Sequence, residues 1–137
     1  MAVEVDRNRQ VVERFRQAVE SGDMQELARV QRELLTDDFV QEWPQSGERI
    51  RGKANVIAIN ENYEQSTGTS PKMALRGISG AGDHWVVEGT IDYGDGTPVS
   101  YVGIYEVKDG KLTKATEYFA NPFEAPEWRR QWVERID

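Results

Sequence analysis

The sequence predicts an α+β fold in which three helices pack in a curved antiparallel sheet and a short helix ends the chain. Apolar residues recur at helical spacing before the loop at residues 64–71, and beyond that loop they alternate with polar residues, which is typical of strands. The length of 137 residues favours one domain over residues 1–137. Helices followed by an antiparallel meander typically form two layers, and a sheet that curves around three helices encloses a pocket.

Three helices are expected in the N-terminal half. The first covers residues 6–20, and Gly22 is suited to end it. Asp23 can cap the second helix, which extends to about residue 35, because its carboxylate can accept the free backbone N–H groups of the first turn. The third helix begins near Lys53 and carries along one side Val56, Ile59 and Tyr63.

A short strand is expected between the second and third helices, over residues 37–43. Alternation places Phe39, Gln41 and Trp43 on one face, and Pro44 stops the strand. The polar, basic stretch that follows is expected to cross the rim of the pocket and enter the third helix. It is not a phosphate loop, because the glycine and lysine spacing of such loops is absent.

Three glycine-containing turns, GAGD, YGDGT and KDGK, divide the second half into strands, and two of them contain the hairpin signal Asp-Gly. The expected strands cover residues 72–79, 84–93, 98–107 and 111–120. The final PEWRRQW is expected to form a helix with Trp128 and Trp132 on one side, covering the mouth of the barrel or a partner.

The composition excludes several classes of site and partner. The chain has no cysteine and a single histidine, His84, so we expect no metal site built on thiolates or clustered histidines. No glycine-rich fingerprint opens a helix, and no cofactor is expected. The net charge of −7 argues against a nucleic-acid partner. No signal peptide or membrane-spanning run is visible, which predicts a cytoplasmic protein without a membrane partner.

The hairpins also predict which residues share a face of the sheet. With two-residue turns at 95–96 and 109–110, the face toward the helices would carry Trp85, Val87, Ile91, Val102, Ile104, Ala115 and Phe119. The outer face would carry Glu88, Thr90, Asp92, Tyr101, Tyr105, Lys114, Thr116 and Tyr118. Its three tyrosines are typical of an interface. A register shift of one residue would exchange the two faces.

Glu117 is the exception on the predicted apolar face, where it lies between Ala115 and Phe119. A buried carboxylate without a charged partner has a raised pKa, which suits a general acid or base near neutral pH. Two alternatives remain open. Glu117 could pair with a polar residue of a helix or loop, such as Arg51 or Arg76, or a bulge could turn it outward.

Nearly the whole chain resembles the SnoaL-like branch of the nuclear transport factor 2-like superfamily. The resemblance rests on FVQEWPQSGERIRGK and on DGKLTKATEYFANPFEAPEW, above all on the Q-x-W-P loop running into R-G-K and on the final strand ending EYFANPF. It implies a cone-shaped α+β barrel with a deep apolar pocket, and a homodimer formed through the outer sheet face. The superfamily includes polyketide cyclases, ketosteroid isomerase, scytalone dehydratase, limonene epoxide hydrolase and non-catalytic binding proteins. In the cyclases a carboxylate on the last strand acts as acid or base, and Glu117 stands at the matching place.

Two functions are therefore open. In the first, the protein is a cofactor-independent enzyme of isomerase, cyclase or dehydratase type, acting on a small apolar molecule that is cyclic or bears a carbonyl. Glu117 would move the proton, and the substrate would be bound by Gln41, Trp43, Tyr63, Trp85 and Phe119. In the second, the same fold is a ligand-binding or dimeric assembly module without turnover. A polar group within hydrogen-bond reach of Glu117, such as Gln41, Asn60 or Tyr63, would favour the enzyme.

Overall fold

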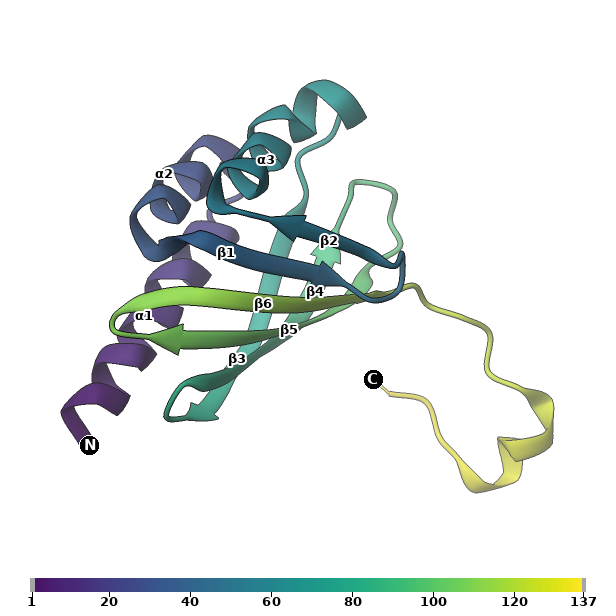
Figure 1. The fold of residues 1–137 in the computed structure, drawn as a ribbon. Coiled ribbons are helices and arrows are strands. Elements are labelled where there is room, and N and C mark those ends of the chain that lie inside the picture. Colours follow the sequence, from purple (N-terminus) through teal and green to yellow (C-terminus); the bar gives the residue numbers. More distant parts are fainter. Residues whose placement is uncertain (1, 137) are drawn as a thin grey trace.

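Three helices cover one face of a curved six-stranded sheet in a computed structural model, which describes residues 2–136 (Figure 1). The helices are α1 (Ala2–Glu20), α2 (Met24–Leu34) and α3 (Lys53–Thr67). The strands are β1 (Leu35–Trp43), β2 (Glu48–Arg51), β3 (Lys72–Ala81), β4 (His84–Asp92), β5 (Val99–Lys108) and β6 (Lys111–Ala120). They lie in the order β2-β1-β6-β5-β4-β3, so the sheet stays open between β2 and β3. The predicted α+β fold class is confirmed.

The sheet is mixed, whereas the sequence predicted a purely antiparallel one. β1 runs parallel to β6, with Gln41 beside Ala115, and all other neighbouring strands are antiparallel. The strand β2 was not expected. It forms a hairpin with β1 and is followed by Gly52, which has a φ of 90° and leads directly into α3. The stretch after Trp43 therefore forms a turn and an edge strand before it enters the third helix.

The capping signal at Asp23 sets the start of α2 as predicted, whereas α1 begins at Ala2 and not at the expected residue 6. The carboxylate of Asp23 accepts the backbone N–H groups of Gln25 at 2.9 Å and Glu26 at 3.2 Å at the start of α2. Gly22 precedes this cap with a φ of 71°. Helix α3 continues to Thr67, further than expected, and ends where Gly68 adopts the left-handed conformation.

The strand register differs by one residue from the prediction in the centre of the sheet. The connection between β4 and β5 is longer than a two-residue turn, so Gly89 pairs with Tyr101. The tight turn after β5 is present, but a bulge leaves Thr113 without a partner and places Tyr105 opposite Ala115. Both irregularities shift the pairing of β5 with its neighbours by one residue. A shift of one residue moves each side chain of β5 to the opposite face of the sheet.

The exchange corrects the predicted faces of β5. Tyr101 and Tyr105 lie on the inner face, and only 2% of the surface of each is exposed. Val102 and Ile104 lie on the outer face instead, and Ile104 is 36% exposed. The predicted outer face with three tyrosines is therefore wrong for two of them, and Tyr118 alone remains outside.

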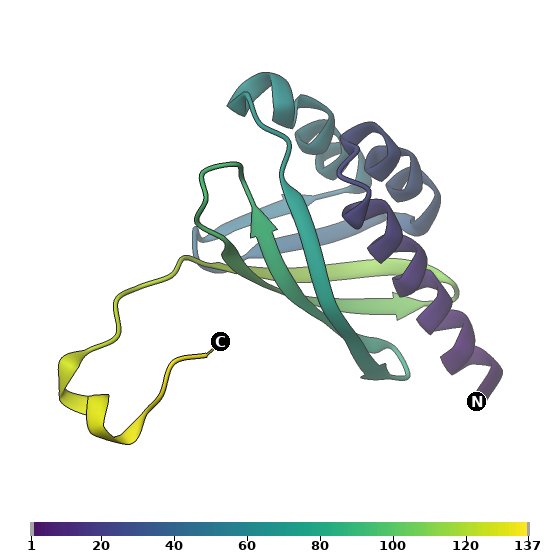
Figure 2. The same cartoon turned by 180° about the vertical axis from the view of Figure 1, so that it is seen from behind.

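The C-terminal segment leaves the sheet after β6 and extends away from the rest of the chain (Figures 1 and 2). It contains η1 (Glu127–Trp132), a six-residue 3-10 helix, where the sequence predicted a short terminal helix. Trp128 and Trp132 are 73% and 71% exposed, so they do not cover the mouth of the barrel in this chain. That they cover a partner stays a prediction.

No helix of the described residues has the length and apolar character needed to cross a membrane.

The core lies between the helices and the inner sheet face, and its largest fully buried side chains include Trp85, Phe39 and Leu35.

Candidate active site

A cavity of about 280 Å³ opens between the helices and the inner face of the sheet. Its walls are mostly apolar and aromatic, which is typical of sites that bind small organic molecules. No lysine or arginine lines it, and Glu117 is its one acidic residue. The lining residues are Phe15, Val19, Met24, Leu27, Gln31, Gln41, Trp43, Ile59, Asn60, Tyr63, Pro71, Met73, Ile91, Tyr93, Tyr101, Glu117 and Phe119.

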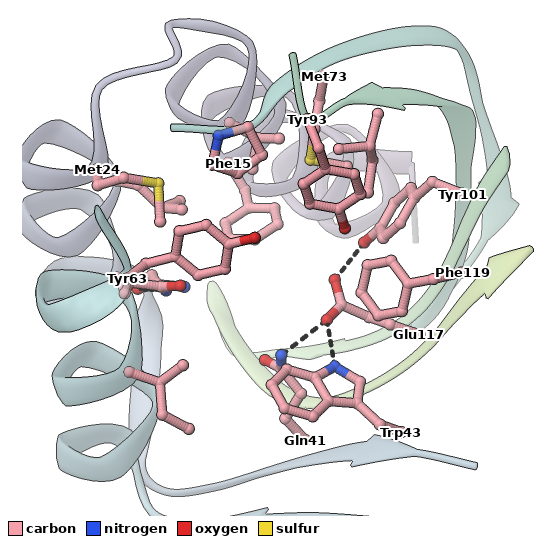
Figure 3. Close-up of a pocket in the computed structure, with 17 residues that line it drawn as sticks. Phe15, Met24, Gln41, Trp43, Tyr63, Met73, Tyr93, Tyr101, Glu117 and Phe119 are labelled. Atoms are coloured by element: carbon pink, nitrogen blue, oxygen red, sulfur yellow. Dashed lines mark hydrogen bonds between the residues drawn. The ribbon is translucent and has the colours of Figure 1, made fainter. Parts of the chain in front are cut away.

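Four neutral donors surround the carboxylate of Glu117. Figure 3 shows three of them, Gln41, Trp43 and Tyr101. The Gln41 amide donates to Oε1 at 2.7 Å, and the Trp43 indole N–H donates to the same oxygen at 2.9 Å. The Tyr101 hydroxyl donates a short hydrogen bond to Oε2, and the Tyr105 hydroxyl lies 3.4 Å from that oxygen. Tyr101 and Tyr105 also hydrogen-bond each other. Both oxygens of the carboxylate are thus held by the protein.

The strand pairing brings these five side chains together. Because β1 is parallel to β6 with Gln41 beside Ala115, Gln41 and Trp43 extend from the same face as Glu117. On the other side of β6, Gly103 is directly opposite Glu117. A Cβ atom at Gly103 would lie 2.7 Å from the Tyr105 hydroxyl and would also meet that of Tyr101. Glycine at position 103 therefore leaves the space in which both hydroxyls reach the carboxylate.

Burial raises the pKa of Glu117 above its usual value, and the hydrogen bonds from Trp43, Tyr101 and Tyr105 oppose that rise. Burial, followed by the nearby Glu117 charge, raises the pKa of both tyrosines well above the usual value. At neutral pH a larger fraction of Glu117 is therefore protonated than of a free glutamate. This is the property that a general acid or base needs.

The alternatives left open for Glu117 are not realised in the described part of the chain. Its partners there include no cation, and both Arg51 and Arg76 are exposed. The one bulge in β6 lies at Thr113, and Glu117 faces the cavity. The polar partner predicted at Gln41 is present, but Asn60 donates to Gln31 instead.

Tyr63 and Tyr93 reach into the cavity from α3 and from the loop after β4 (Figure 3). The structure records no hydrogen-bond partner for either hydroxyl among the residues it describes. Burial raises the pKa of Tyr93, with smaller contributions from the nearby Tyr63 and Glu117. These two hydroxyls are thus free to meet a ligand in the cavity.

Trp85 does not line the cavity, which corrects its predicted role in binding the substrate. It is 1% exposed, and its indole N–H donates to the Gly82 carbonyl at 3.0 Å. The Arg9 guanidinium lies 5.8 Å from the centre of its ring. Gln41, Trp43, Tyr63 and Phe119 do line the cavity, and their role in binding a substrate stays a prediction.

Sequence reasoning missed several residues of the site. Tyr101 and Tyr105 were placed on the wrong face, and Gln31 and Tyr93 were not considered. A signal was present for the tyrosines, since they stand two residues before and two residues after Gly103 on the same side of the strand, and a glycine within a strand often marks a close approach of other groups to the backbone. Gln31 lies among apolar helix positions and has no comparable signal.

The described residues contain no group of three or more His, Asp or Glu side chains that could hold a metal ion. His84 is exposed at the start of β4, where it contacts Asp83 at 2.8 Å, and it lies outside the cavity. Two basic residues at the start of α3 and in the strand before it form ion pairs, Arg49 with Glu42 at 2.7 Å and Lys53 with Asp37 at 3.0 Å.

Comparisons with known proteins place the chain in a family. The sequence profile of the SnoaL-like domain matches residues 12–115. An NTF-2 like protein of unknown function from Burkholderia xenovorans LB400 is 35% identical, with 96% of this chain and 97% of that chain covered and a TM-score of 0.76. A search of curated proteins finds no significant match.

Similar solved structures carry different functional descriptions. A proposed ketosteroid isomerase from Kribbella flavida is 24% identical, with a TM-score of 0.81 over 98% of this chain and 93% of that one. An LEH-like epoxide hydrolase from M. tuberculosis is 25% identical, with a TM-score of 0.63 over 85% of this chain and 84% of that one. At these identities the likeness supports the fold and does not select an activity. The profile match and the Burkholderia relative together show that the chain belongs to the SnoaL-like family of nuclear transport factor 2-like proteins.

Proposed function

We propose that the protein is a cofactor-independent enzyme that moves a proton within a small, largely apolar molecule, at a carbon next to a carbonyl group. One observation carries the proposal: Glu117 lies in an apolar cavity, has a raised pKa and has only neutral hydrogen-bond partners among the described residues. A carboxylate in such surroundings is a stronger base than in water, because it is poorly solvated there. Isomerase, cyclase and dehydratase reactions all use this step.

In the proposed step, Glu117 removes the proton from the carbon, and the electron pair of the C–H bond forms the double bond of an enolate. The negative charge moves to the carbonyl oxygen. The free hydroxyls of Tyr63 and Tyr93 are available to donate a hydrogen bond to that oxygen, and such donors contribute most when the site excludes water. Glu117 then returns the proton to another carbon, so the step needs no oxidant, reductant or cofactor.

The four donors position the carboxylate and limit how far its pKa rises. Trp43 and Tyr101 lower the pKa, so Glu117 can be ionised to a useful degree before it accepts a proton. Gln41 is the donor with the most rotatable side chain, and it also lines the cavity. Its amide can turn aside when the arriving proton occupies Oε1. The substrate is a small neutral or weakly polar molecule, because no cation of the cavity wall could balance an anion.

Proton exchange with solvent tests this proposal. The wild-type protein would be incubated in D₂O with cyclic ketones such as 1-decalone, and loss of the α-proton signals followed by NMR. We expect exchange faster than in buffer, and we expect Glu117→Gln to remove the acceleration. Glu88→Gln is the matched control, because Glu88 is an exposed carboxylate on the outer face of the same sheet. Ketones that bind without any accelerated exchange would contradict the proposal.

The second candidate function is a binding module with the same cavity and no turnover. It is favoured by the saturation of Glu117, since four donors already occupy its two oxygens and could hold it as a structural group. The exchange experiment separates the two functions, because a binding module would retain the ketone and leave its α-protons unexchanged. A small apolar molecule as the partner and a cytoplasmic location are common to both proposals.

We further propose a homodimer through the outer sheet face. That face exposes Val86 by 37%, Ile104 by 36% and Tyr118 by 39%, and neighbouring apolar side chains of this size often mark an interface. Sedimentation is expected to give twice the 15.6 kDa mass of the chain, and Ile104→Lys is expected to lower it. A wild-type monomer at about 50 μM, a concentration at which even a weak dimer forms, would contradict this assembly.

A further inference from the structure

The helix wall of the cavity carries a pair of side-chain amides that the proposed proton transfer does not use. Gln31 extends from α2 and is only 3% exposed. Asn60 extends from α3 and donates from its amide nitrogen to Gln31 Oε1 at 2.8 Å. Both residues line the cavity, whereas Glu117 and its donors extend from the strands.

Only two of the four polar atoms of this amide pair are hydrogen-bonded within the described residues. Across the described residues, the Gln31 Nε2 group has no acceptor and Asn60 Oδ1 has no donor, and neither atom is fully enclosed by the protein. If both amides were rotated by 180°, the pair would still offer one free donor and one free acceptor. Gln31 is almost fully buried, and buried polar side chains are almost always paired, so its unpaired amide group at the cavity wall points to a ligand.

The surroundings select the chemistry of that ligand group. The neighbouring lining residues of α2 and α3 are apolar apart from Tyr63, and no lysine or arginine lines the cavity. A carboxylate or phosphate bound here would be a buried anion without a cation, which is costly. A neutral group that both donates and accepts, such as a hydroxyl or a carboxamide, matches the free donor and acceptor.

We propose that Gln31 and Asn60 form a second polar subsite, which binds a neutral hydroxyl or carboxamide of the ligand while its other polar group lies at Glu117. The substrate class is thereby an apolar ring system with polar groups at both ends, small enough for a cavity of about 280 Å³. This inference rests on the proposed function only in that both use the same cavity. It concerns binding and does not need proton transfer to occur.

Two probes that differ by one hydroxyl test the subsite: 2-naphthol and 2,6-dihydroxynaphthalene. Their dissociation constants would be measured by NMR titration of the wild-type protein and of Gln31→Leu/Asn60→Leu. Replacing both partners by apolar groups of similar size avoids leaving one of them unpaired. We expect the wild type to bind the diol about 2- to 10-fold more tightly than 2-naphthol, the range that one net hydrogen bond supplies. In the double variant this preference should vanish or reverse.

A further variant keeps the result interpretable. Gln31→Met, which is close to glutamine in length, repeats the measurement where the double variant does not fold. The preference for the diol is a binding measurement that needs no turnover, so a wild type that prefers the diol without accelerating proton exchange keeps the subsite while the proton-transfer proposal fails. The subsite is overturned if the wild type binds neither probe or shows no preference for the diol. It is also overturned if the preference persists without the two amides.

Discussion

Trp85→Ala is expected to lower the free energy of unfolding by about 3–5 kcal/mol, the usual cost of removing a large aromatic side chain from a core. Trp85 is 1% exposed, packs in the core between the helices and the sheet, and uses its indole N–H to bond the Gly82 carbonyl. Its removal would leave a cavity among residues that cannot collapse fully, and a backbone carbonyl would lose its donor. Urea denaturation of the purified variant measures the change.

Trp43→Ala is the matched comparison, because both tryptophans lie on the inner side of the sheet. Trp43 is only partly buried, lines the existing cavity and meets Phe119 edge-on at 6.3 Å between ring centres. We expect a loss of stability smaller than that of Trp85→Ala, together with weaker binding of 2-naphthol. Equal stability losses in the two variants would contradict the assignment of Trp43 to the cavity and Trp85 to the core.

Glu117→Gln is expected to reduce any proton-transfer activity by about 10²- to 10⁴-fold, the contribution typical of one positioned acid or base. The fold should tolerate the change. The glutamine oxygen can accept from the Trp43 indole, which can only donate, and its amide group can donate to the Tyr101 hydroxyl, which can also accept. The loss of activity would thus occur without a loss of structure.

The stability of the same variant should differ from that of the wild type in a pH-dependent way. The pKa of Glu117 is raised in the folded protein, so folding favours the protonated form. The stabilisation is fully present below the unfolded pKa of about 4.3 and is lost as pH rises through the folded pKa. Relative to Glu117→Gln, the wild type should therefore become less stable between about pH 4 and the folded pKa.

Carboxylates with a lowered pKa, such as Glu42 beside Arg49 and Lys114, give the opposite slope. They are common to both proteins and cancel when the two stability curves are subtracted. A titration of the Glu117 carboxyl carbon by NMR gives the pKa directly. A value below that of a free glutamate, with a less stable Gln variant at neutral pH, would rule out the acid/base role.

Glu117→Leu provides the contrast to the glutamine variant. It removes the acceptor of four donors, and among the described residues Glu117 is the one recorded acceptor of the Trp43 indole N–H. Each donor left unpaired costs about 1–3 kcal/mol, so we expect the leucine variant to be clearly less stable than the glutamine variant at neutral pH. If the two were equally stable, the hydrogen bonds to Glu117 would contribute little to holding the site together.

The sequence by itself determined the features that depend on neighbouring residues. Helical spacing and the cap at Asp23 located α1 and α2, and the last strand was predicted with the bounds observed for β6. Alternation in the first strand correctly put Gln41 and Trp43 on one face, and the charge of Glu117 among apolar neighbours singled out a residue that lines the cavity. These signals are local, because a period or a cap involves residues a few positions apart.

The tertiary structure alone decided how these pieces meet. The bulge at Thr113 and the long loop before β5 changed the register, so that Tyr101 and Tyr105 point at Glu117 and not at the outside. The parallel pairing of β1 with β6 joins Gln41 to a carboxylate 76 positions along the chain. The amide pair on the helix wall likewise joins residues 29 positions apart. A contact of this kind depends on the path of the whole chain, and one unpaired residue in a strand is enough to reverse which side chains enter the cavity.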